Sequence, residues 1–478
     1  MEGGSDQTGP TGLTCQRHGQ PTRITCVTCD TPICPACAVR TQVGLKCPDH
    51  ASKPVAPSKP RFQGLVGLLI LAALAGFIQL VRTTGRGEPA TPPCPTETAP
   101  DVGIGSQGGD HWTELSPSGL CGRYDAASVW TGTQMIVWGG ENCAGAACPT
   151  YRAPHLADGA VYTHQADAWR KMASAPLSPR SPAVTVWTGT EMVVWGGVNA
   201  EQFLADGAAY DPARDRWRPL ASGPLSPRTG VMSVWSGREL LVWGGGNSGD
   251  TFADGAAYDP ATDRWRTMVQ GPLGRRTGGA TAWTGREMVI WGGVDVAGGR
   301  EFKDGAAYDP ATNGWRIIAA SPLPGRDDPA TAWTGRELLV WGGNTVDGGF
   351  FADGAAYDPA ADRWRPLPLP GAALAARTAP ATVWTGREMV VWGGFGVPGA
   401  ADGGPLDQII ERRTLLSPVG DGAAYDPAAD RWRPLEPVPL LGRGLPVAVW
   451  DGGGMLLWGG LVVVSSPASS SEGVRYTP

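Results

Sequence analysis

The stretch Arg228-Thr-Gly-Val-Met-Ser-Val-Trp235-Ser-Gly-Arg-Glu-Leu-Leu-Val-Trp243-Gly-Gly decides the fold of this chain, because close copies of it recur along most of the sequence. A variable loop follows, and then Asp254-Gly-Ala-Ala-Tyr258-Asp-Pro-Ala-Thr-Asp-Arg-Trp265. The Trp-Gly-Gly signature occurs seven times, with its tryptophans at Trp138, Trp195, Trp243, Trp291, Trp341, Trp392 and Trp458. The sequence is therefore a series of repeats.

Each repeat predicts four short antiparallel strands. Residues 231–235 and 239–243 are joined by a Ser-Gly-Arg turn, in which the glycine takes the positive φ that a tight hairpin needs. Residues 255–259 form the third strand, and residues 264–268 form the fourth after a Pro-Ala-Thr-Asp turn. A unit of about 50 residues with four strands predicts one blade of an all-β propeller.

The double glycine, followed by tyrosine and tryptophan on the next two strands, resembles the kelch repeat. The resemblance covers residues 112–478 and implies a seven-bladed kelch-type β-propeller over residues 111–478. The last repeat ends in a third strand at 472–478, and residues 111–115 match the fourth strand of the other repeats. We expect this N-terminal strand to complete the last blade, which leaves no unpaired edge in the ring.

Composition narrows the class of protein. The 70 glycines and 44 prolines suit many short strands and turns, and a net charge of −6 gives no indication of a nucleic-acid surface. Six of the ten cysteines precede residue 48, and the other four lie between positions 94 and 148. The two groups therefore belong to different parts of the chain.

Residues 15–50 contain four pairs of Cys or His residues, each separated by two residues. These eight are the ligands that two tetrahedral zinc ions need, and so short a segment has too little apolar material to fold without metal. A disulfide framework is the alternative, but two histidines in ligand register do not suit it. The predicted zinc ligands are Cys15, His18, Cys26, Cys29, Cys34, Cys37, Cys47 and His50.

The spacing of these pairs resembles the B-box zinc finger, a module that mostly binds other proteins. The resemblance implies that the first and third pairs hold one ion and that the second and fourth pairs hold the other. The nine-residue gap before the fourth pair and its Cys-x2-His form depart from the family pattern, so the pairing stays open.

Residues 64–81 are eighteen residues with only Gln79 polar, which is at the lower limit for a membrane-spanning helix. A cleavable signal peptide would not follow a zinc finger, and a buried core helix would lack a partner domain. We predict a single signal-anchor transmembrane helix, preceded by a disordered N-terminus (1–14), the finger and a linker (51–63). A Pro-, Thr- and Gly-rich stalk (82–110) follows it.

Redox chemistry predicts the orientation across the membrane. Zinc-bound thiolates favour the reducing cytosol, whereas the four later cysteines have no ligand-like spacing and suit an oxidising exterior. We therefore expect a cytoplasmic finger and an extracytoplasmic propeller. Of the three possible pairings, we favour disulfides Cys94–Cys121 and Cys143–Cys148.

Each repeat also has an arginine seven residues before its first tryptophan. One interpretation is a channel-mouth site for anions or acidic peptides; the other is a structural latch in which the arginines pair, between blades, with the acidic residue that opens each third strand. Repetition in every blade favours the latch. The arginines are Arg123, Arg180, Arg228, Arg276, Arg326, Arg377 and Arg443, and the acidic residues are Asp158, Asp206, Asp254, Asp304, Asp353, Asp421 and Glu472.

The variable loops are the expected binding surface, above all the long insertion at residues 395–420, because variable loops on a rigid scaffold usually carry binding. We predict a membrane-anchored recognition or scaffold protein, whose propeller binds a protein or a glycan and whose finger binds a cytosolic protein partner. The alternative is a sugar-modifying ectoenzyme resembling the kelch-type mutarotases. A copper oxidase is less suited, because the propeller's three histidines lie around the first repeat.

Overall fold

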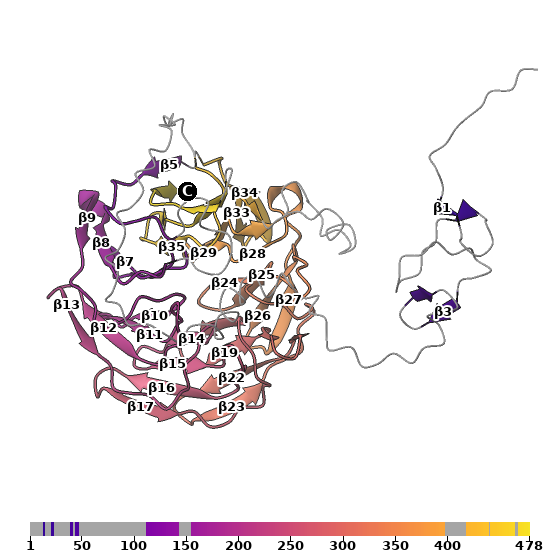
Figure 1. The fold of residues 1–478 in the computed structure, drawn as a ribbon, viewed down its shortest axis with the longest axis horizontal. Coiled ribbons are helices and arrows are strands. Elements are labelled where there is room, and N and C mark those ends of the chain that lie inside the picture. The colour runs from indigo at the N-terminus through magenta and orange to yellow at the C-terminus, as the bar shows by residue number, and fades with distance from the viewer. Residues whose placement is uncertain are drawn as a thin grey trace, which may run out of the picture. The chain divides into compact units, whose positions relative to one another are not determined.

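The computed structural model describes residues 111–142, 154–396, 417–438, 440–463 and 467–478, together with four short strands between residues 13 and 46. The chain divides into two compact units, Met1–Gln63 and Gly64–Pro478. The described part of the second unit is all-β and propeller-like (Figure 1).

The described part of the second unit contains seven four-stranded antiparallel sheets. The first four sheets are β6 (Ala127–Trp130), β7 (Gln134–Trp138), β8 (Gly159–Thr163) and β9 (Ala168–Lys171); β10 (Val184–Trp187), β11 (Met192–Trp195), β12 (Gly207–Asp211) and β13 (Arg216–Pro219); β14 (Met232–Trp235), β15 (Leu240–Trp243), β16 (Gly255–Asp259) and β17 (Arg264–Thr267); and β18 (Ala280–Trp283), β19 (Met288–Trp291), β22 (Gly305–Asp309) and β23 (Gly314–Ile317). The last three are β24 (Ala330–Trp333), β25 (Leu338–Trp341), β26 (Gly354–Asp358) and β27 (Arg363–Pro366); β29 (Ala381–Trp384), β30 (Met389–Trp392), β33 (Gly422–Asp426) and β34 (Arg431–Pro434); and β35 (Val447–Trp450), β36 (Met455–Trp458), β39 (Gly473–Thr477) and β5 (His111–Glu114).

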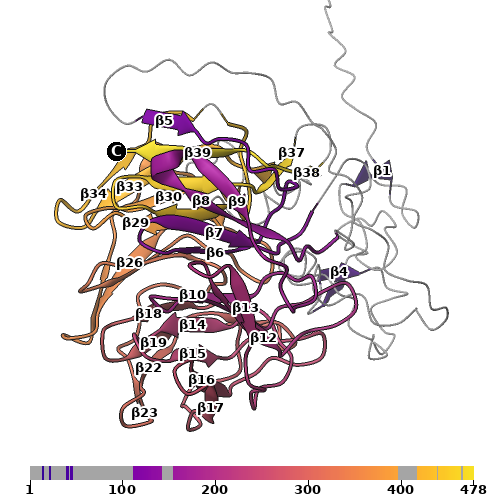
Figure 2. The ribbon, with the colours of Figure 1, turned by 90° about the vertical axis from the view of Figure 1, so that its left-hand side faces the viewer.

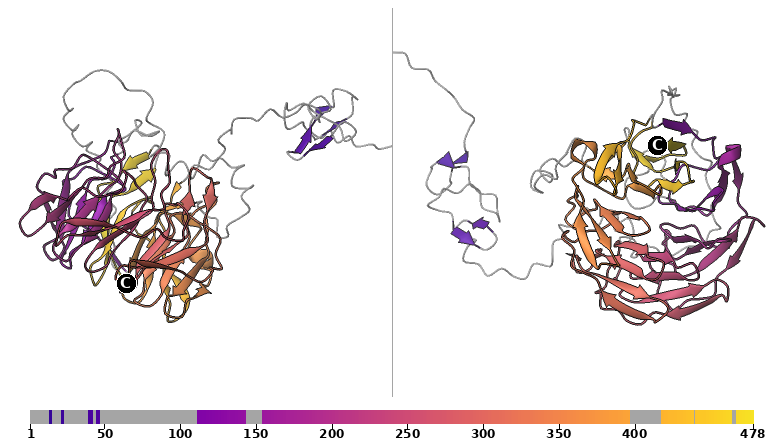
Figure 3. Two further views of the ribbon diagram at one scale, coloured as in Figure 1. Left: turned by 90° about the horizontal axis from the view of Figure 1, so that it is seen from below. Right: turned by 180° about the vertical axis from the view of Figure 1, so that it is seen from behind.

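The sheets close into a ring around their first strands. β6 contacts β10, and the contacts continue through β14, β18, β24, β29 and β35, which in turn contacts β6. The right half of Figure 3 shows this arrangement from behind. The first strands therefore line the centre of the ring.

The first described strand of the second unit, β5, closes the ring, as the sequence predicts. β5 pairs antiparallel with β39, so that Trp112 lies opposite Tyr476 (Figure 2). Trp112 is only 4% exposed, and its ring centroid lies 4.9 Å from that of Tyr476 and 6.1 Å from that of Trp392 in the preceding sheet. Its indole N–H donates at 3.0 Å to the carbonyl of Glu436, which follows β34, the last strand of that sheet. The closing strand thus holds two sheets.

Aromatic side chains fill the wedge between neighbouring sheets. Trp243, at the end of a second strand, is buried and packs 5.8 Å from Trp315 on the fourth strand of the next sheet. Trp315 also packs against Tyr308, the tyrosine of its own sheet, at 5.1 Å. Equivalent Trp–Trp pairs recur around the ring, which explains why three aromatic positions are constant in the repeat.

The two ends of the sheets differ. The end with the first-to-second and third-to-fourth turns (residues 236–239 and 259–263 in the third sheet) is called here the turn face. The opposite end, with the second-to-third loops and the connections between sheets, is the loop face.

Outside the main sheets are β20 (Val294–Asp295) with β21 (Arg300–Glu301), β28 (Arg377–Thr378) with β31 (Phe395–Gly396) and β32 (Ser417–Pro418), β37 (Leu461–Val463) with β38 (Pro467–Ser469), and the 3-10 helices η2 (His164–Ala166) and η3 (Gly371–Ala373).

In the first unit, β1 (Leu13–Thr14) pairs with β2 (Pro21–Thr22), and β3 (Val39–Thr41) pairs with β4 (Gly44–Lys46). β1 includes two residues of the N-terminal segment that the sequence predicted to be disordered. The predicted membrane helix 64–81, the linker 51–63 and the stalk 82–110 lie outside the described residues. Within the described parts of the chain, no helix is both long and apolar enough to cross a bilayer.

Candidate functional site

The seven repeated arginines are buried, and each pairs with the acidic residue that opens the third strand. Each guanidinium is fully buried, whereas the carboxylates are 39–57% exposed. The N–O distances are 2.6–3.0 Å for the pairs Arg123–Asp158, Arg180–Asp206, Arg228–Asp254, Arg276–Asp304, Arg326–Asp353, Arg377–Asp421 and Arg443–Glu472. Buried guanidinium groups fit a latch rather than a site for anions.

The expectation that these pairs join neighbouring blades is wrong, because both partners belong to one sheet. The backbone of the arginine makes the connection between sheets instead. The carbonyl of Arg228 accepts from Gly197 N–H at 3.0 Å, and its N–H donates to the carbonyl of Leu204 at 3.1 Å, both in the preceding sheet. Its side chain donates to the carbonyl of Gly244 and to Asp254 in its own sheet.

Aromatic rings complete three of these latches. The guanidinium carbon of Arg228 lies 3.9 Å from the ring centroid of Phe252, and Arg276 and Arg326 lie similarly over Phe302 and Phe351. Burial lowers the pKa of Arg276 and of Arg326, and the carboxylate partner counters the shift. An arginine so placed stays charged and is held from both sides.

The candidate site lies where the repeat is broken, next to these arginines at the centre of the ring. The arginine is followed by Thr-Gly in the third and fourth repeats, but by Tyr124-Asp125 in the first and by Asp327-Asp328 in the fifth. Burial, followed by the charges of Glu141 and Asp328, raises the pKa of Asp125 to about 8. Burial raises the pKa of Asp328 to about 6. The charge of Asp328 therefore acts on the Asp125 carboxyl of a separate sheet at the loop face.

A polar cluster surrounds Glu141 in the first sheet. The hydroxyl of Tyr124 donates to Glu141 Oε2 at 2.6 Å, and the hydroxyl of Ser181 donates to Oε1 at 2.5 Å. His155 Nε2 lies 3.7 Å from Oε1, and neither ring nitrogen of His155 has a hydrogen-bond partner among the described residues. Burial lowers the pKa of His155 more than the carboxylate raises it, so the imidazole is neutral at pH 7. A neutral imidazole beside carboxyl groups can transfer protons.

Asp327 replaces a threonine that joins consecutive sheets. Thr277 Oγ1 donates to the carbonyl of Gly230 in the preceding sheet at 2.6 Å. Asp327 Oδ1 occupies the equivalent position next to Gly278. A Cβ on Gly230 would overlap Thr277 Oγ1, and a Cβ on Gly278 would overlap Asp327 Oδ1 in the same way. Asp327 is 5% exposed and its Oδ1 has no hydrogen-bond partner. Only a protonated carboxyl can donate to a carbonyl as the threonine does.

The groups facing Asp327 keep it protonated. Burial is the largest cause that raises its pKa well above the usual range, and the charges of Asp328 and Glu301 add to it. The N–H of Asp328 acts in the opposite direction. We infer that the Asp327 carboxyl is neutral.

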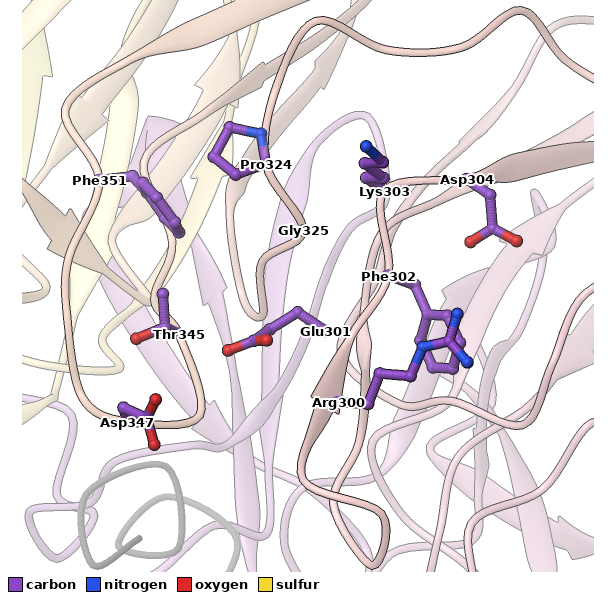
Figure 4. A pocket seen from close by; sticks show the side chains of 10 residues that line it. All are labelled: Arg300, Glu301, Phe302, Lys303, Asp304, Pro324, Gly325, Thr345, Asp347 and Phe351. Carbon is purple, nitrogen blue, oxygen red and sulfur yellow. The ribbon is translucent and has the colours of Figure 1, made fainter. Parts of the chain in front are cut away.

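A cavity of about 590 Å³ opens nearby, between the second-to-third loops of the fourth and fifth sheets (Figure 4). Phe351 and Thr345 lie on one side, Phe302 and Arg300 lie on the other, and Glu301 points between them. Glu301 Oε1 accepts from the N–H of Val346 at 2.8 Å, which ties the two loops together. The cavity is thus part of the variable loop face.

The other predicted site residues fall outside the described residues. These are the eight zinc ligands (Cys15, His18, Cys26, Cys29, Cys34, Cys37, Cys47 and His50) and Cys94, Cys143 and Cys148. Cys121 is disulfide-bonded, and its partner lies outside the described residues, so the pairing with Cys94 stays a prediction. Among the residues that the structure describes, no three His, Cys, Asp or Glu side chains are grouped to hold a metal ion.

Comparisons with known proteins agree with both modules. Residues 108–277 match a family model described as the KLHDC2/KLHL20/DRC7 Kelch-repeats domain, and residues 10–44 match the B-box zinc finger. The B-box match implies zinc binding. A solved structure titled "Structure of YjhT" is 17% identical, with a TM-score of 0.49, and the match covers 64% of this chain and 99% of that one. The comparison with curated proteins found no match.

The acidic centre of the loop face was missed by the sequence analysis. Its signal was that Tyr124-Asp125 and Asp327-Asp328 place acidic residues directly after the arginine, where the other five repeats have uncharged residues. Glu141 and His155 gave no such signal, because they lie in the part of the repeat where every copy differs.

The latch interpretation predicts a loss of stability from Arg228→Met. The change leaves the buried carbonyl of Gly244 and the partly buried carbonyl of Ser226 without their donor, so we expect the free energy of unfolding to fall by about 2–3 kcal/mol. The matched control is Arg264→Met on the turn face, an exposed arginine that should change stability by less than about 0.5 kcal/mol. Urea unfolding followed by tryptophan fluorescence measures both. Equal stabilities would contradict the latch.

Asp327 predicts a specific dependence of stability on pH. Its pKa is higher in the folded state than in the unfolded chain, so its contribution is fully present below the unfolded pKa and is lost as pH rises toward the folded pKa. Asp327→Asn keeps a donor and does not titrate. We therefore expect its melting temperature to exceed that of the wild type at pH 8, with a smaller difference at pH 4.

The control for this comparison is Asp347→Asn, at an exposed loop carboxyl. This variant should follow the wild type at every pH. A difference between Asp327→Asn and wild type that does not grow with pH would show that Asp327 is ionised in the folded protein.

Proposed function

We propose that this chain is a membrane-anchored recognition protein with a seven-bladed kelch-type propeller outside the cytoplasm. The loop face of the propeller binds a protein or glycan ligand, and a cytosolic zinc finger with two zinc ions binds a protein partner. The matches to kelch and B-box models support a protein-interaction scaffold. Residues 64–81 provide the anchor, and the disulfide-bonded Cys121 supports an oxidising surrounding for the propeller.

One observation carries the proposal: the repeat is held constant everywhere except on the loop face. The buried arginines fix the connections between sheets, while the second-to-third loops differ in length and build the cavity beside Glu301 and Phe351. A rigid scaffold with one variable face is the usual arrangement of a binding protein. The buried arginines themselves are not proposed as ligand contacts.

A sugar-modifying ectoenzyme, such as a mutarotase-like isomerase, is the second candidate. It is favoured by the cluster of Glu141, the neutral His155 and Asp125, whose pKa of about 8 suits proton transfer near neutral pH. Glu141→Gln would remove the central carboxylate of this cluster. Loss of aldose anomerisation on that change, measured by NMR, would favour this candidate over recognition.

A single labelling experiment tests location and recognition together. Asp347→Cys places a thiol on the loop face and Arg238→Cys places one on the turn face, each in the full chain within intact cells. A membrane-impermeant maleimide carrying a photo-crosslinker should label both, because both faces lie outside. Illumination should give a discrete adduct of higher mass from position 347 only.

The outcomes separate the two parts of the proposal. Absence of labelling at both positions would contradict the extracytoplasmic propeller. Labelling without an adduct from position 347, with or without one from position 238, would contradict recognition by the loop face.

The finger should contain two zinc ions per chain. We expect metal analysis of the purified full chain to give a ratio of two, and chelation to abolish partner binding by the finger without changing propeller unfolding, since the two units are separate. A ratio of one, or none, would overturn the eight-ligand assignment.

A further inference from the structure

The repeated ion pairs bury opposite partners on the two faces of the ring. On the loop face the arginines are fully buried and the carboxylates are about half exposed, as in Arg228–Asp254. On the turn face the order is reversed in the pairs that join the first-to-second turn to the third-to-fourth turn. Arg238 is 81% exposed and its partner Asp259 is 13% exposed, with 3.6 Å between them. The same holds for Arg286–Asp309, Arg336–Asp358 and Arg387–Asp426.

The turn itself explains why the acidic partner is inside. Asp259 begins the Asp-Pro turn, and its Oδ1 accepts the N–H of Ala261. Asp358 and Asp426 each accept two such backbone N–H groups. The carboxylate therefore accepts hydrogen bonds from the backbone of its own turn, and the arginine of the neighbouring turn pairs with it from the solvent side.

Further arginines add to the exposed positive charge. Arg264, Arg363 and Arg431 begin the fourth strands directly after these turns, are exposed, and make no ion pair with any described residue. Four acids of this face, Asp215, Asp263, Asp362 and Asp430, are 44–61% exposed; each accepts a hydrogen bond from a tyrosine and is paired with an arginine of the preceding sheet. Arginine thus dominates what the turn face presents to solvent.

The chain reaches the ring on this same face. His111 begins β5 and lies opposite Thr477, the last residue of β39. A third strand ends at the turn face, as Asp259 does in β16. The stalk, residues 82–110, connects the apolar stretch 64–81 to β5 in the sequence. Its 29 residues would span roughly 100 Å at most if fully extended. So long a stalk does not fix the orientation of the ring, but charge can.

We propose that the turn face is a docking surface for anionic phospholipid headgroups, which holds the ring with its loop face away from the bilayer. The proposal rests on the membrane anchor of the proposed function. Guanidinium groups bind phosphate oxygens in pairs, and near-identical repeats place them at equivalent heights on consecutive sheets. Many weak contacts of this kind act together and weaken as salt is added.

The test uses the full chain reconstituted in vesicles, with a dye at Thr262, an exposed position in a turn. Vesicles of phosphatidylcholine alone, or with three parts in ten of phosphatidylglycerol, carry a lipid-bound quencher. We expect at least twofold stronger quenching in the anionic vesicles, and loss of the difference in 0.5 M salt. Equal quenching in both vesicles would overturn the proposal.

Matched variants show whether the arginines are responsible. Replacing Arg286, Arg336 and Arg387 with glutamine should abolish the difference, and replacing the same three with lysine should retain it. Replacing Arg275, Arg300 and Lys303 with glutamine removes the same charge from the loop face and should leave the difference intact. If the loop-face variant loses it equally, net charge rather than the turn face attracts the lipid.

Flotation separates this proposal from the anchor on which it rests. An anchored chain floats with neutral vesicles in high salt. If it does not, the anchor is absent, and salt-sensitive flotation with anionic vesicles alone, lost in the triple glutamine variant, would still support docking. Flotation with neutral vesicles, combined with quenching that does not depend on phosphatidylglycerol, would refute docking and keep the anchor.

Discussion

The ring depends on one arginine in each repeat, because that residue joins two sheets at once. The backbone of Arg228 is hydrogen-bonded to Gly197 and Leu204 of the preceding sheet, and its guanidinium is bonded to Gly244 and Asp254 of its own. The double glycine is part of the same constraint. Gly244 and Gly245 have φ values of 71° and 86°, and a Cβ on Gly244 would meet the carbonyl oxygen of Arg276. Arginine and glycine are therefore constant for one structural reason.

A scaffold fixed in this way makes departures from the repeat informative. Where Thr277 joins two sheets through its hydroxyl, the equivalent Asp327 has a buried carboxyl with a raised pKa, which costs stability as pH rises. The next residue, Asp328, places a second carboxyl at the centre of the ring. Its charge raises the pKa of Asp125, which belongs to another sheet. Acidic groups that weaken a scaffold are more easily explained by binding or proton transfer than by folding.

Much of this could be predicted from the sequence, and the exceptions have physical reasons. The four strands per repeat and the closing strand at residues 111–114 were predictable, because the same local sequence pattern occurs in every repeat. The pairing of Arg228 within its own sheet was not predictable, because the spacing also allows a partner in a neighbouring sheet. The contact of Glu141 with Tyr124, Ser181 and His155 depends on how the loop folds back. The periodicity of the sequence does not predict these contacts of Glu141.

The polarity of the ring follows from the same backbone requirements as its closure. A connection between sheets contains carbonyl groups that need a buried donor, so arginine lies inside and its carboxylate lies outside on the loop face. An Asp-Pro turn contains N–H groups that need a buried acceptor, so aspartate lies inside and arginine lies outside on the turn face. Each of these ion pairs is neutral in sum, but it exposes the carboxylate on the loop face and the arginine on the turn face. Repetition adds these small contributions in one direction, which a single pair could not do.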